Sequence, residues 1–241
     1  MKFAPIILFV YNRPFLTRRT IDYLKKNIYA KNSDLYIFCD GAKNNSDEIL
    51  VNMVNQVLID INGFKNVTIK KSIKNIGLAD NIVSGLNYIS KQFDRFIVLE
   101  DDIVTSKYFL YYMNKMLDSY ENNMKVYHIN GWSPPLNKTN KYPPIFFQRM
   151  MFCWGWASWA DRWEHFDRNF ERIDYFYSKK ANLRNFASLD GGVAIWWQYY
   201  LNKFRFKRTW AVFWYLAIIR RQGLCLTFVK SLTDNIGNDS S

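Results

Sequence analysis

The 241-residue sequence contains no run of about eighteen apolar residues, the length that a membrane-crossing helix needs, so no transmembrane helix is expected. The N-terminus also lacks the basic region and cleavage pattern of a signal peptide. Three cysteines, Cys39, Cys153 and Cys225, are odd in number and have no zinc-type spacing, which favours a reduced, cytosolic protein. No internal repeat or low-complexity tract is visible. These absences argue against membrane-spanning, disulfide-stabilised, zinc-finger and repeat proteins.

Acidic residues are also scarce, with 21 Asp and Glu against 33 Lys and Arg, which gives a formal net charge of +12. Such a surplus attracts nucleotide phosphates, anionic lipid headgroups or nucleic acid, and the charge alone does not choose among them. Aromatic residues are abundant by contrast, with 9 Trp, 16 Tyr and 19 Phe, and they concentrate in the second half. This distribution predicts an aromatic-walled cleft or a surface that meets an amphipathic partner.

Strand and helix patterns alternate along the first hundred residues. Apolar runs predict strands at 3–11, 35–39, 67–69 and 96–99, and helical spacing predicts helices at about 15–27, 46–61 and up to about 92. This alternation predicts an α/β fold with a mostly parallel central sheet and helices on both faces. We expect one domain, residues 1–241, with a ligand-binding first half, 1–103, and an aromatic-rich second half, 104–241.

Three consecutive carboxylates, Glu100-Asp101-Asp102, follow the buried strand at 96–99. Because adjacent like charges repel, they need a cation or hydrogen-bond donors, and oxygen ligands of this kind suit Mg²⁺ or Mn²⁺. A solvated acidic turn is the alternative interpretation. Polar loops also follow the first two strands, at residues 11–13 and 39–41, and a glycine-containing loop precedes Gly77. Since ligands collect at the carboxyl ends of parallel strands, these loops predict one shared site.

The second half is less regular. We expect a helix at 108–120, a strand and turn at 126–131, a proline-rich loop at 133–144, a tryptophan-rich segment at 146–163, a helix from about 210 to 222 and a last strand at 224–229. Five tryptophans are expected in the core: Trp163, Trp196, Trp197, Trp210 and Trp214.

The order of these motifs resembles nucleotide-sugar glycosyltransferases of the GT-A fold. It is most similar to bacterial relatives of the N-acetylglucosaminyltransferase I type, which carry Glu-Asp-Asp where most GT-A enzymes carry Asp-X-Asp. The resemblance covers nearly the whole chain, through residues 9–14, Asp40-Gly41, residues 75–78, residues 98–102, residues 153–156 and Asn235-Ile236-Gly237. It implies a Rossmann-like, nucleotide-sugar-binding first half and an acceptor-binding second half.

The resemblance also implies roles for individual residues. Tyr11, Asn12 and Arg13 would lie near the base and phosphates, Asp40 near the base or ribose, and Asn75 and Gly77 at the nucleotide. Asp102 would bind Mn²⁺ or Mg²⁺, Asp101 would face the ribose or sugar, and Glu100 would orient the loop. Trp154, Gly155 and Trp156 would form a wall facing the acceptor or the sugar.

The implied reaction is metal-dependent transfer of a hexosyl or N-acetylhexosaminyl group, with inversion, in bacterial surface polysaccharide or glycoconjugate synthesis. The donor would be a nucleoside diphosphate sugar, and Asp40 favours a UDP-sugar. The acceptor would be a saccharide, a lipid-linked glycan or a glycoprotein. Relatives of this kind continue to a histidine that can complete the metal shell, whereas this sequence ends at Ser241, so a truncated chain or a separate following domain is one interpretation.

The catalytic base does not follow from the motif. In animal enzymes of this type it lies in a Trp-Asp-Asp-Trp-like segment, and residues 210–214 here read Trp-Ala-Val-Phe-Trp. Asp190, on a glycine-rich turn ahead of the aromatic segment, is the first substitute. Asp161 and Glu164 come next.

The basic and aromatic residues of 203–221 predict a solvated face or peripheral contact with an anionic membrane at the inner leaflet, which would give access to a lipid-linked saccharide. Two other functions remain open. One is a catalytically weak, nucleotide-sugar-binding scaffold for another transferase. The other is an α/β protein that binds nucleic acid, which leaves the carboxylate triplet unexplained.

Overall fold

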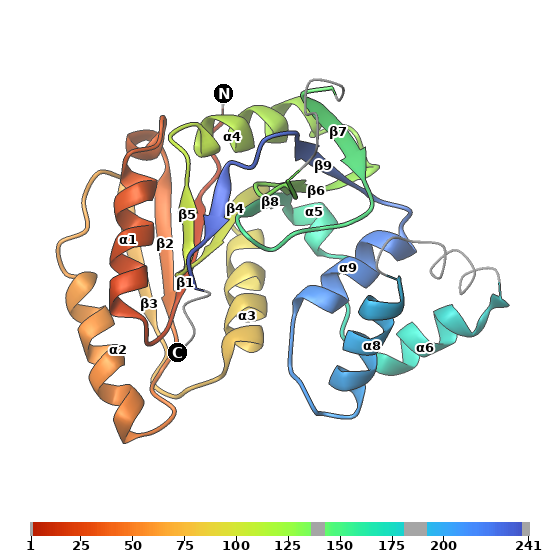
Figure 1. Ribbon diagram of the computed structural model, residues 1–241, viewed down its shortest axis with the longest axis horizontal. Helices are drawn as coiled ribbons and strands as arrows, with labels where there is room; N and C mark the ends of the chain where they lie inside the picture. Colours follow the sequence, from red (N-terminus) through yellow and green to blue (C-terminus); the bar gives the residue numbers. More distant parts are fainter. Residues whose placement is uncertain (1, 136–142, 181–191, 238–241) are drawn as a thin grey trace.

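An eight-stranded sheet forms the centre of the computed structural model, which describes residues 2–135, 143–180 and 192–237 (Figure 1). Its strands lie in the order β3-β2-β1-β4-β8-β6-β9-β7. The strands of the main sheet are β1 Ile6–Val10, β2 Asp34–Cys39, β3 Asn66–Lys71, β4 Arg95–Glu100, β6 Val126–Asn130, β7 Ile145–Gln148, β8 Trp156–Trp159 and β9 Leu224–Phe228. Among the described strands of this sheet, only β7 and β8 run antiparallel to their neighbours. The expected fold class, α/β with a mostly parallel sheet, is confirmed.

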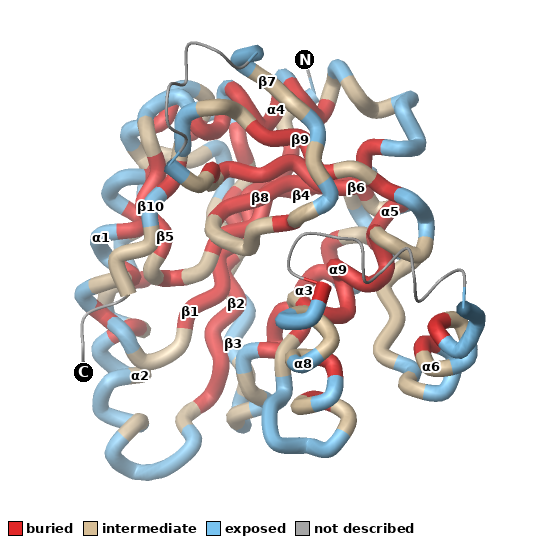
Figure 2. Tube along the Cα trace, turned by 45° about the vertical axis from the view of Figure 1, so that its right-hand side comes forward, coloured by how far each residue is buried: buried red, intermediate tan, exposed pale blue. Residues whose placement is uncertain are grey.

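Helices cover both faces of the sheet, because successive strand residues point to opposite sides. The helices are α1 Pro14–Lys25, α2 Asn45–Val57, α3 Leu78–Ser90, α4 Phe109–Tyr120, α5 Ala160–Trp163, α6 Phe170–Ser178, α8 Gly192–Lys203 and α9 Ala211–Arg220, with a 3₁₀ turn at Ala30–Asn32. In β1, Ile6 and Leu8 belong to the core cluster that contains α1, α2 and α4, whereas Ile7 and Phe9 belong to the cluster that contains α3, α6 and α9. The central strands of the sheet are buried between the two clusters, whereas the edge strands β3 and β7 are partly exposed (Figure 2).

The carboxyl ends of β1, β2 and β4 meet at one edge, because these strands are parallel neighbours. Beyond β4, Asp101 and Asp102 form the turn that leads to β5, Ile103–Thr105. A second, two-stranded sheet pairs β5 with β10, Thr233–Asn235, in antiparallel register. The N–H of Ile236 donates to the carbonyl of Asp102 at 2.9 Å, so this pairing fixes the end of the described chain beside the acidic turn.

Three elements differ from the expectations. The tryptophan-rich segment contributes β8 to the centre of the sheet, between β4 and β6. Residues 233–235 form a strand that the sequence did not indicate. Helix α8 was not predicted. Trp197 on this helix is 63% exposed, so the prediction that Trp197 lies in the core is wrong. Among the described residues no helix is both long and apolar enough to cross a lipid bilayer.

Candidate functional site

A cleft of about 440 Å³ opens where the carboxyl ends of β1, β2 and β4 meet the beginning of α3. Its volume falls within the range of about 300–1,000 Å³ that is usual for small-molecule sites. The structure brings nine sequence-predicted residues together in its lining: Tyr11, Asn12, Arg13, Asp40, Asn75, Gly77, Glu100, Asp101 and Asp102. Residues separated by up to 91 positions thus meet in one place because the strands that carry them are adjacent.

The buried carboxylate of Asp40 ties the end of β2 to the loop before α3. Its Oδ1 accepts hydrogen bonds from the N–H groups of Gly41 and Ile76, both at 2.9 Å, and its Oδ2 accepts one from Gly77 at 2.8 Å. The Asn75 Nδ2 donates in return to the carbonyl of Gly41 at 2.8 Å. Gly77 begins α3 at φ +80°, a conformation that favours glycine, and a Cβ there would meet no atom within 4 Å. This leaves room for a ligand to approach the backbone.

Tyr11 and Asn12 are positioned by Asp47, a residue of the first turn of α2. The Tyr11 hydroxyl donates to one carboxylate oxygen of Asp47 and the Asn12 Nδ2 donates to the other, both at 2.8 Å. The Asp47 N–H is itself capped by the side chain of Asn44 at 2.9 Å. Burial and the bond to Asp47 raise the pKa of Tyr11, which keeps its hydroxyl protonated as a donor.

The three carboxylates of residues 100–102 lie together with Arg13. An Arg13 guanidinium nitrogen donates to Asp102 Oδ2 at 3.0 Å and lies 3.8 Å from Asp101 Oδ1. Burial, followed by repulsion from Asp102 and Asp101, raises the pKa of Glu100 to about 8. Burial also raises the pKa of Asp101 to about 7, against the opposing effect of Arg13. One arginine therefore does not neutralise this group of carboxylates.

The described lining of the cleft contains more acidic than basic side chains, although the whole chain carries a formal charge of +12. Asp40, Glu100, Asp101 and Asp102 face only Arg13 and Lys43. An oxygen-rich, electronegative donor set of this kind fits Mg²⁺ or Mn²⁺, which often bind through one or two carboxylates and complete their shell with substrate phosphates and water. Within the described ranges no group of three or more His, Cys, Asp or Glu has the arrangement of an all-protein metal site.

A second, apolar cavity of about 490 Å³ lies between the 151–154 segment and the helices α8 and α9. Trp154 lines it and packs edge-on against Trp132, with ring centroids 4.9 Å apart. Gly155 follows at φ +74°, and a Cβ there would lie 2.8 Å from a Thr233 methyl group, so only glycine fits at this position. Trp154 therefore forms part of an aromatic-lined cavity, and its contact with an acceptor or sugar stays a prediction.

Trp156 does not belong to that wall. It is fully buried in β8, where its ring stacks between His128, at 5.0 Å, and Trp210, at 5.4 Å. Since side chains alternate along a strand, Trp156 faces the core, and the expectation that it meets a ligand is corrected. Trp163, Trp210 and Trp214 are buried as expected.

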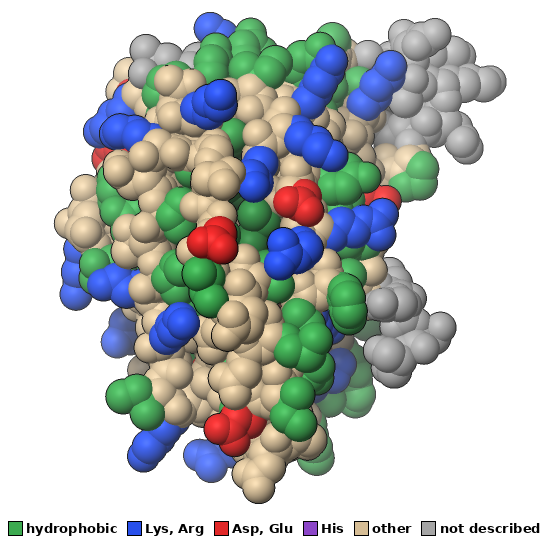
Figure 3. Space-filling model, turned by 90° about the vertical axis from the view of Figure 1, so that its left-hand side faces the viewer, with side chains coloured by type: hydrophobic (Ala, Val, Ile, Leu, Met, Phe, Trp, Pro, Cys, Tyr) green, Lys and Arg blue, Asp and Glu red, His purple; other side chains and the backbone are tan. Residues whose placement is uncertain are grey.

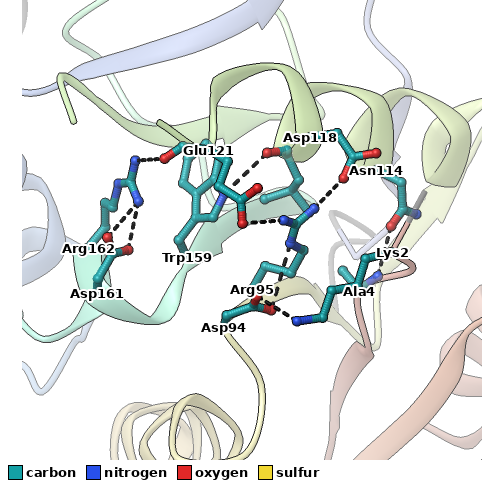
Figure 4. A network of polar contacts seen from close by, with 11 residues as sticks. Lys2, Ala4, Asp94, Arg95, Asn114, Asp118, Glu121, Trp159, Asp161 and Arg162 are labelled. Atoms are coloured by element: carbon teal, nitrogen blue, oxygen red, sulfur yellow. Dashed lines mark hydrogen bonds and ion pairs between the residues drawn. The ribbon is translucent and has the colours of Figure 1, made fainter. Parts of the chain in front are cut away.

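Asp161 lies at the other end of the sheet from the cleft. Because β8 runs antiparallel to β4, with Trp159 opposite Arg95, the residues after β8 lie beside the beginning of β4. The Asp161 carboxylate binds the guanidinium of Arg162 at 2.7 and 2.8 Å, within a network that includes Asp94 and Glu121 (Figure 4). The length of β4 separates it from Asp102 by roughly 20 Å. Asp161, and Glu164 beside it, are therefore not placed to act as the base, and Asp190 lies outside the described residues.

Residues 6–171 match the sequence profile of the family described as "Glycosyl transferase family 2". The chain belongs to glycosyltransferase family 2. The match includes all nine of the expected cleft residues and β1 to β4. Among curated protein sequences, none matches this family 2 chain.

Solved structures that the chain resembles include a mannosyltransferase and S. aureus TarS. The mannosyltransferase PcManGT from Pyrobaculum calidifontis, solved with GDP-Man and Mn²⁺, is 11% identical with a TM-score of 0.47, over 68% of this chain and 47% of its own. S. aureus TarS is 11% identical with a TM-score of 0.46, over 69% of this chain and 30% of its own. TarS residues 1–349 in complex with UDP gives 15% identity and a TM-score of 0.40, over 57% and 37%. The family 2 chain spans less than half the length of each of these structures.

Sequence reasoning missed three polar residues that line the cleft or position its side chains, Lys43, Asp47 and Asn81. The Asn44-X-X-Asp47 spacing marks a capped helix start and was available as a signal for the beginning of α2. The spacing does not predict that the Asp47 side chain points toward the loop after β1, because that direction depends on how α2 packs against the sheet.

Proposed function

We propose that this chain transfers a sugar from a nucleoside diphosphate sugar, with a UDP-sugar as the first candidate, to an acceptor hydroxyl. The observation that carries the proposal is the meeting of residues 11–13, Asp40, residues 75–77 and residues 100–102 in one cleft with an excess of carboxylates. A diphosphate would be repelled by that excess unless a cation accompanied it. The cleft is thus suited to a complex of a metal ion and a nucleotide.

In this proposal Asp102 holds Mn²⁺ or Mg²⁺ at the edge of the cleft. When bound, the cation would offset the negative charge that gathers on the leaving diphosphate. Arg13, already within 3.0 Å of Asp102, adds a fixed positive charge beside the same phosphates. Tyr11 and Asn12, held by Asp47, would orient the base, and Asp40 would keep the 75–77 loop open for the nucleotide.

The acceptor is expected at the apolar cavity beside Trp154, which lies in the second half of the chain. Thr233 links the two sites, because its hydroxyl donates to the Trp154 carbonyl at 2.6 Å while β10 pairs with the strand that follows Asp102. We propose a saccharide, lipid-linked or protein-linked glycan as acceptor. A cytoplasmic location at the inner face of a membrane would give access to lipid-linked saccharides.

In narrower terms we propose a bacterial relative of the N-acetylglucosaminyltransferase I type, in which Glu100-Asp101-Asp102 replaces Asp-X-Asp. It would act in surface polysaccharide or glycoconjugate synthesis, transferring a hexosyl or N-acetylhexosaminyl group with inversion. Asp190 remains the first candidate for the base.

The test is a panel of UDP-, GDP- and dTDP-sugars, assayed for Mn²⁺-dependent release of nucleotide with and without simple saccharide acceptors. Release from at least one donor, abolished by chelation, is the expected result. A chain that binds nucleotide with metal but releases nothing from the panel would instead support the scaffold interpretation.

A further inference from the structure

Helix α8 exposes an apolar stripe on the side away from the core. The stripe consists of Val193, Trp197 and Tyr200 on the helix and of Phe204, one residue beyond its end. Their spacings of four, three and four residues place them on one side, because the Phe204 N–H still donates to the Tyr200 carbonyl at 3.0 Å. Their exposed fractions are 85%, 63%, 37% and 61%. The opposite face is anchored, because Tyr199 is fully buried and its hydroxyl donates to Asp174 at 2.7 Å. The helix is therefore fixed in place with its apolar face turned outward.

The loop after α8 extends this stripe and is closed at its base. The Asn202 side chain donates to the Thr209 hydroxyl at 3.0 Å and accepts from the Thr209 N–H at 2.7 Å. The Lys207 N–H donates to the carbonyl of Leu201 at 3.1 Å. Phe206, at the tip, is 77% exposed. These bonds keep the Phe206 side chain exposed to water, whereas a freely moving loop would turn that side chain inward.

Basic side chains flank the exposed aromatic residues. Arg205, Lys207 and Arg208 line a pocket of about 490 Å³ together with Arg168. Arg168 and Arg208 share the single carboxylate of Asp80, whereas Arg205 and Lys207 have no ion pair within the described residues. On the face of α1 and α2, by contrast, Lys and Arg are spread among neutral and some acidic side chains (Figure 3).

We propose that the α8 stripe and the loop of residues 204–208 form a docking surface for an anionic phospholipid bilayer. Phe204, Phe206 and Trp197 would enter the headgroup region, and Arg205 and Lys207 would bind lipid phosphates. A symmetric contact between two copies would bring these cations against their equivalents, which is unfavourable. Charge complementarity therefore favours lipid over a second copy.

This surface deepens the proposed membrane location, on which it rests, and is independent of whether the cleft binds a nucleotide. Helices α8 and α9, which the loop joins at the lower right of Figure 1, also line the apolar cavity through Ile195, Gln198 and Val212. A bilayer at the loop would thus lie next to the cavity where we expect the acceptor.

The test is co-sedimentation of the full chain with phosphatidylglycerol–phosphatidylcholine vesicles and with pure phosphatidylcholine vesicles at low ionic strength. Binding to the anionic vesicles, weakened by salt, is expected. The Arg205→Gln/Lys207→Gln variant should bind them roughly 30-fold more weakly, since each basic side chain near an anionic surface contributes about fivefold. The Phe204→Ser/Phe206→Ser variant should lose at least tenfold.

Two control variants carry matched changes on other surfaces. Lys115→Gln/Lys125→Gln removes two exposed charges, and Ile59→Ser/Met124→Ser removes two exposed apolar side chains; both should bind like the original chain. Thermal unfolding of every variant checks the fold. The proposal is overturned if the vesicles are not bound or if the control variants lose as much binding as the test variants. It is also overturned if sedimentation velocity shows a dimer that dissociates in Phe204→Ser/Phe206→Ser. Binding of a single-stranded oligonucleotide without binding of vesicles would overturn it as well. Nucleotide binding, measured separately, distinguishes failure here from failure of the cleft proposal.

Discussion

Asp47 shows how a residue outside the recognised motifs can control the site. It reaches the cleft through Tyr11 and Asn12, each of which donates to its carboxylate at 2.8 Å. Because both side chains are half-buried, they depend on this acceptor for their orientation. Removing it would leave two donors of the cleft unfixed.

We expect Asp47→Ala to weaken nucleotide binding by about 1–2 kcal/mol, or roughly five- to thirtyfold, by loss of this orientation. Glu48→Ala is the matched control, because it removes an exposed carboxylate from the same helix turn. Calorimetric titration with UDP in the presence of Mn²⁺ measures both variants. Equal affinities would show that Asp47 serves α2 alone.

The identity of the base is the second question at this scale. Asp190→Ala should lower turnover by about a hundredfold or more while nucleotide binding persists, as loss of a general base does. Asp161→Asn should keep near-normal turnover, because Asp161 lies beside the opposite end of β4. A folded Asp190→Ala enzyme with unchanged turnover would remove Asp190 from consideration.

Among the elements, β8 contributes Trp156 to a stack of rings in the core, between His128 and Trp210. His128 of β6 is fully buried against Trp156, its Nε2–H donates to the Phe152 carbonyl at 3.1 Å, and its Nδ1 accepts from the Trp214 indole at 3.2 Å. This pair of bonds fixes the neutral tautomer. Burial lowers the pKa of His128 to about 3.

The free energy of unfolding should therefore decrease as the pH is lowered. Since the unfolded histidine, with a pKa of about 6.5, binds a proton that the folded one refuses, the free energy of unfolding decreases as pH falls below about 6.5 and continues to decrease toward about 3. The full effect is on the order of 4–5 kcal/mol. Denaturant unfolding between pH 7 and pH 4 measures the larger part of this effect, with His128→Gln as comparison. A variant with the same pH slope would contradict this assignment.

The regular elements of the first half could be predicted because each strand and helix carries its own apolar period. The strand predicted at 96–99 is confirmed, with observed bounds of Arg95–Glu100. The places of Trp156 and Asp161 could not be predicted, because both depend on β8 inserting antiparallel between β4 and β6. That direction is set by long-range packing, and nothing within residues 153–163 specifies it.

At the scale of the whole molecule, the cleft could be predicted for a topological reason. Parallel neighbouring strands bring the loops after β1, β2 and β4 to one edge, so polar residues at those positions meet whatever the details of packing. The second half follows no such rule. Its cavity and the α8 surface arise from side-chain packing that the aromatic composition indicates only in outline.

The molecule is basic overall, yet its cleft is rich in carboxylates. The central claim is that a divalent cation binds between these carboxylates and the diphosphate of a nucleotide and offsets their repulsion. The most direct test is the shift in thermal unfolding with UDP, measured with Mn²⁺ and again with a chelator, for the original chain and for Asp102→Asn. Asp60→Asn, an exposed carboxylate elsewhere, is the charge-matched control. Stabilisation by UDP that requires Mn²⁺, is lost in Asp102→Asn and is kept in Asp60→Asn is the predicted result. UDP stabilisation that persists in the chelator, or in Asp102→Asn, would contradict the account.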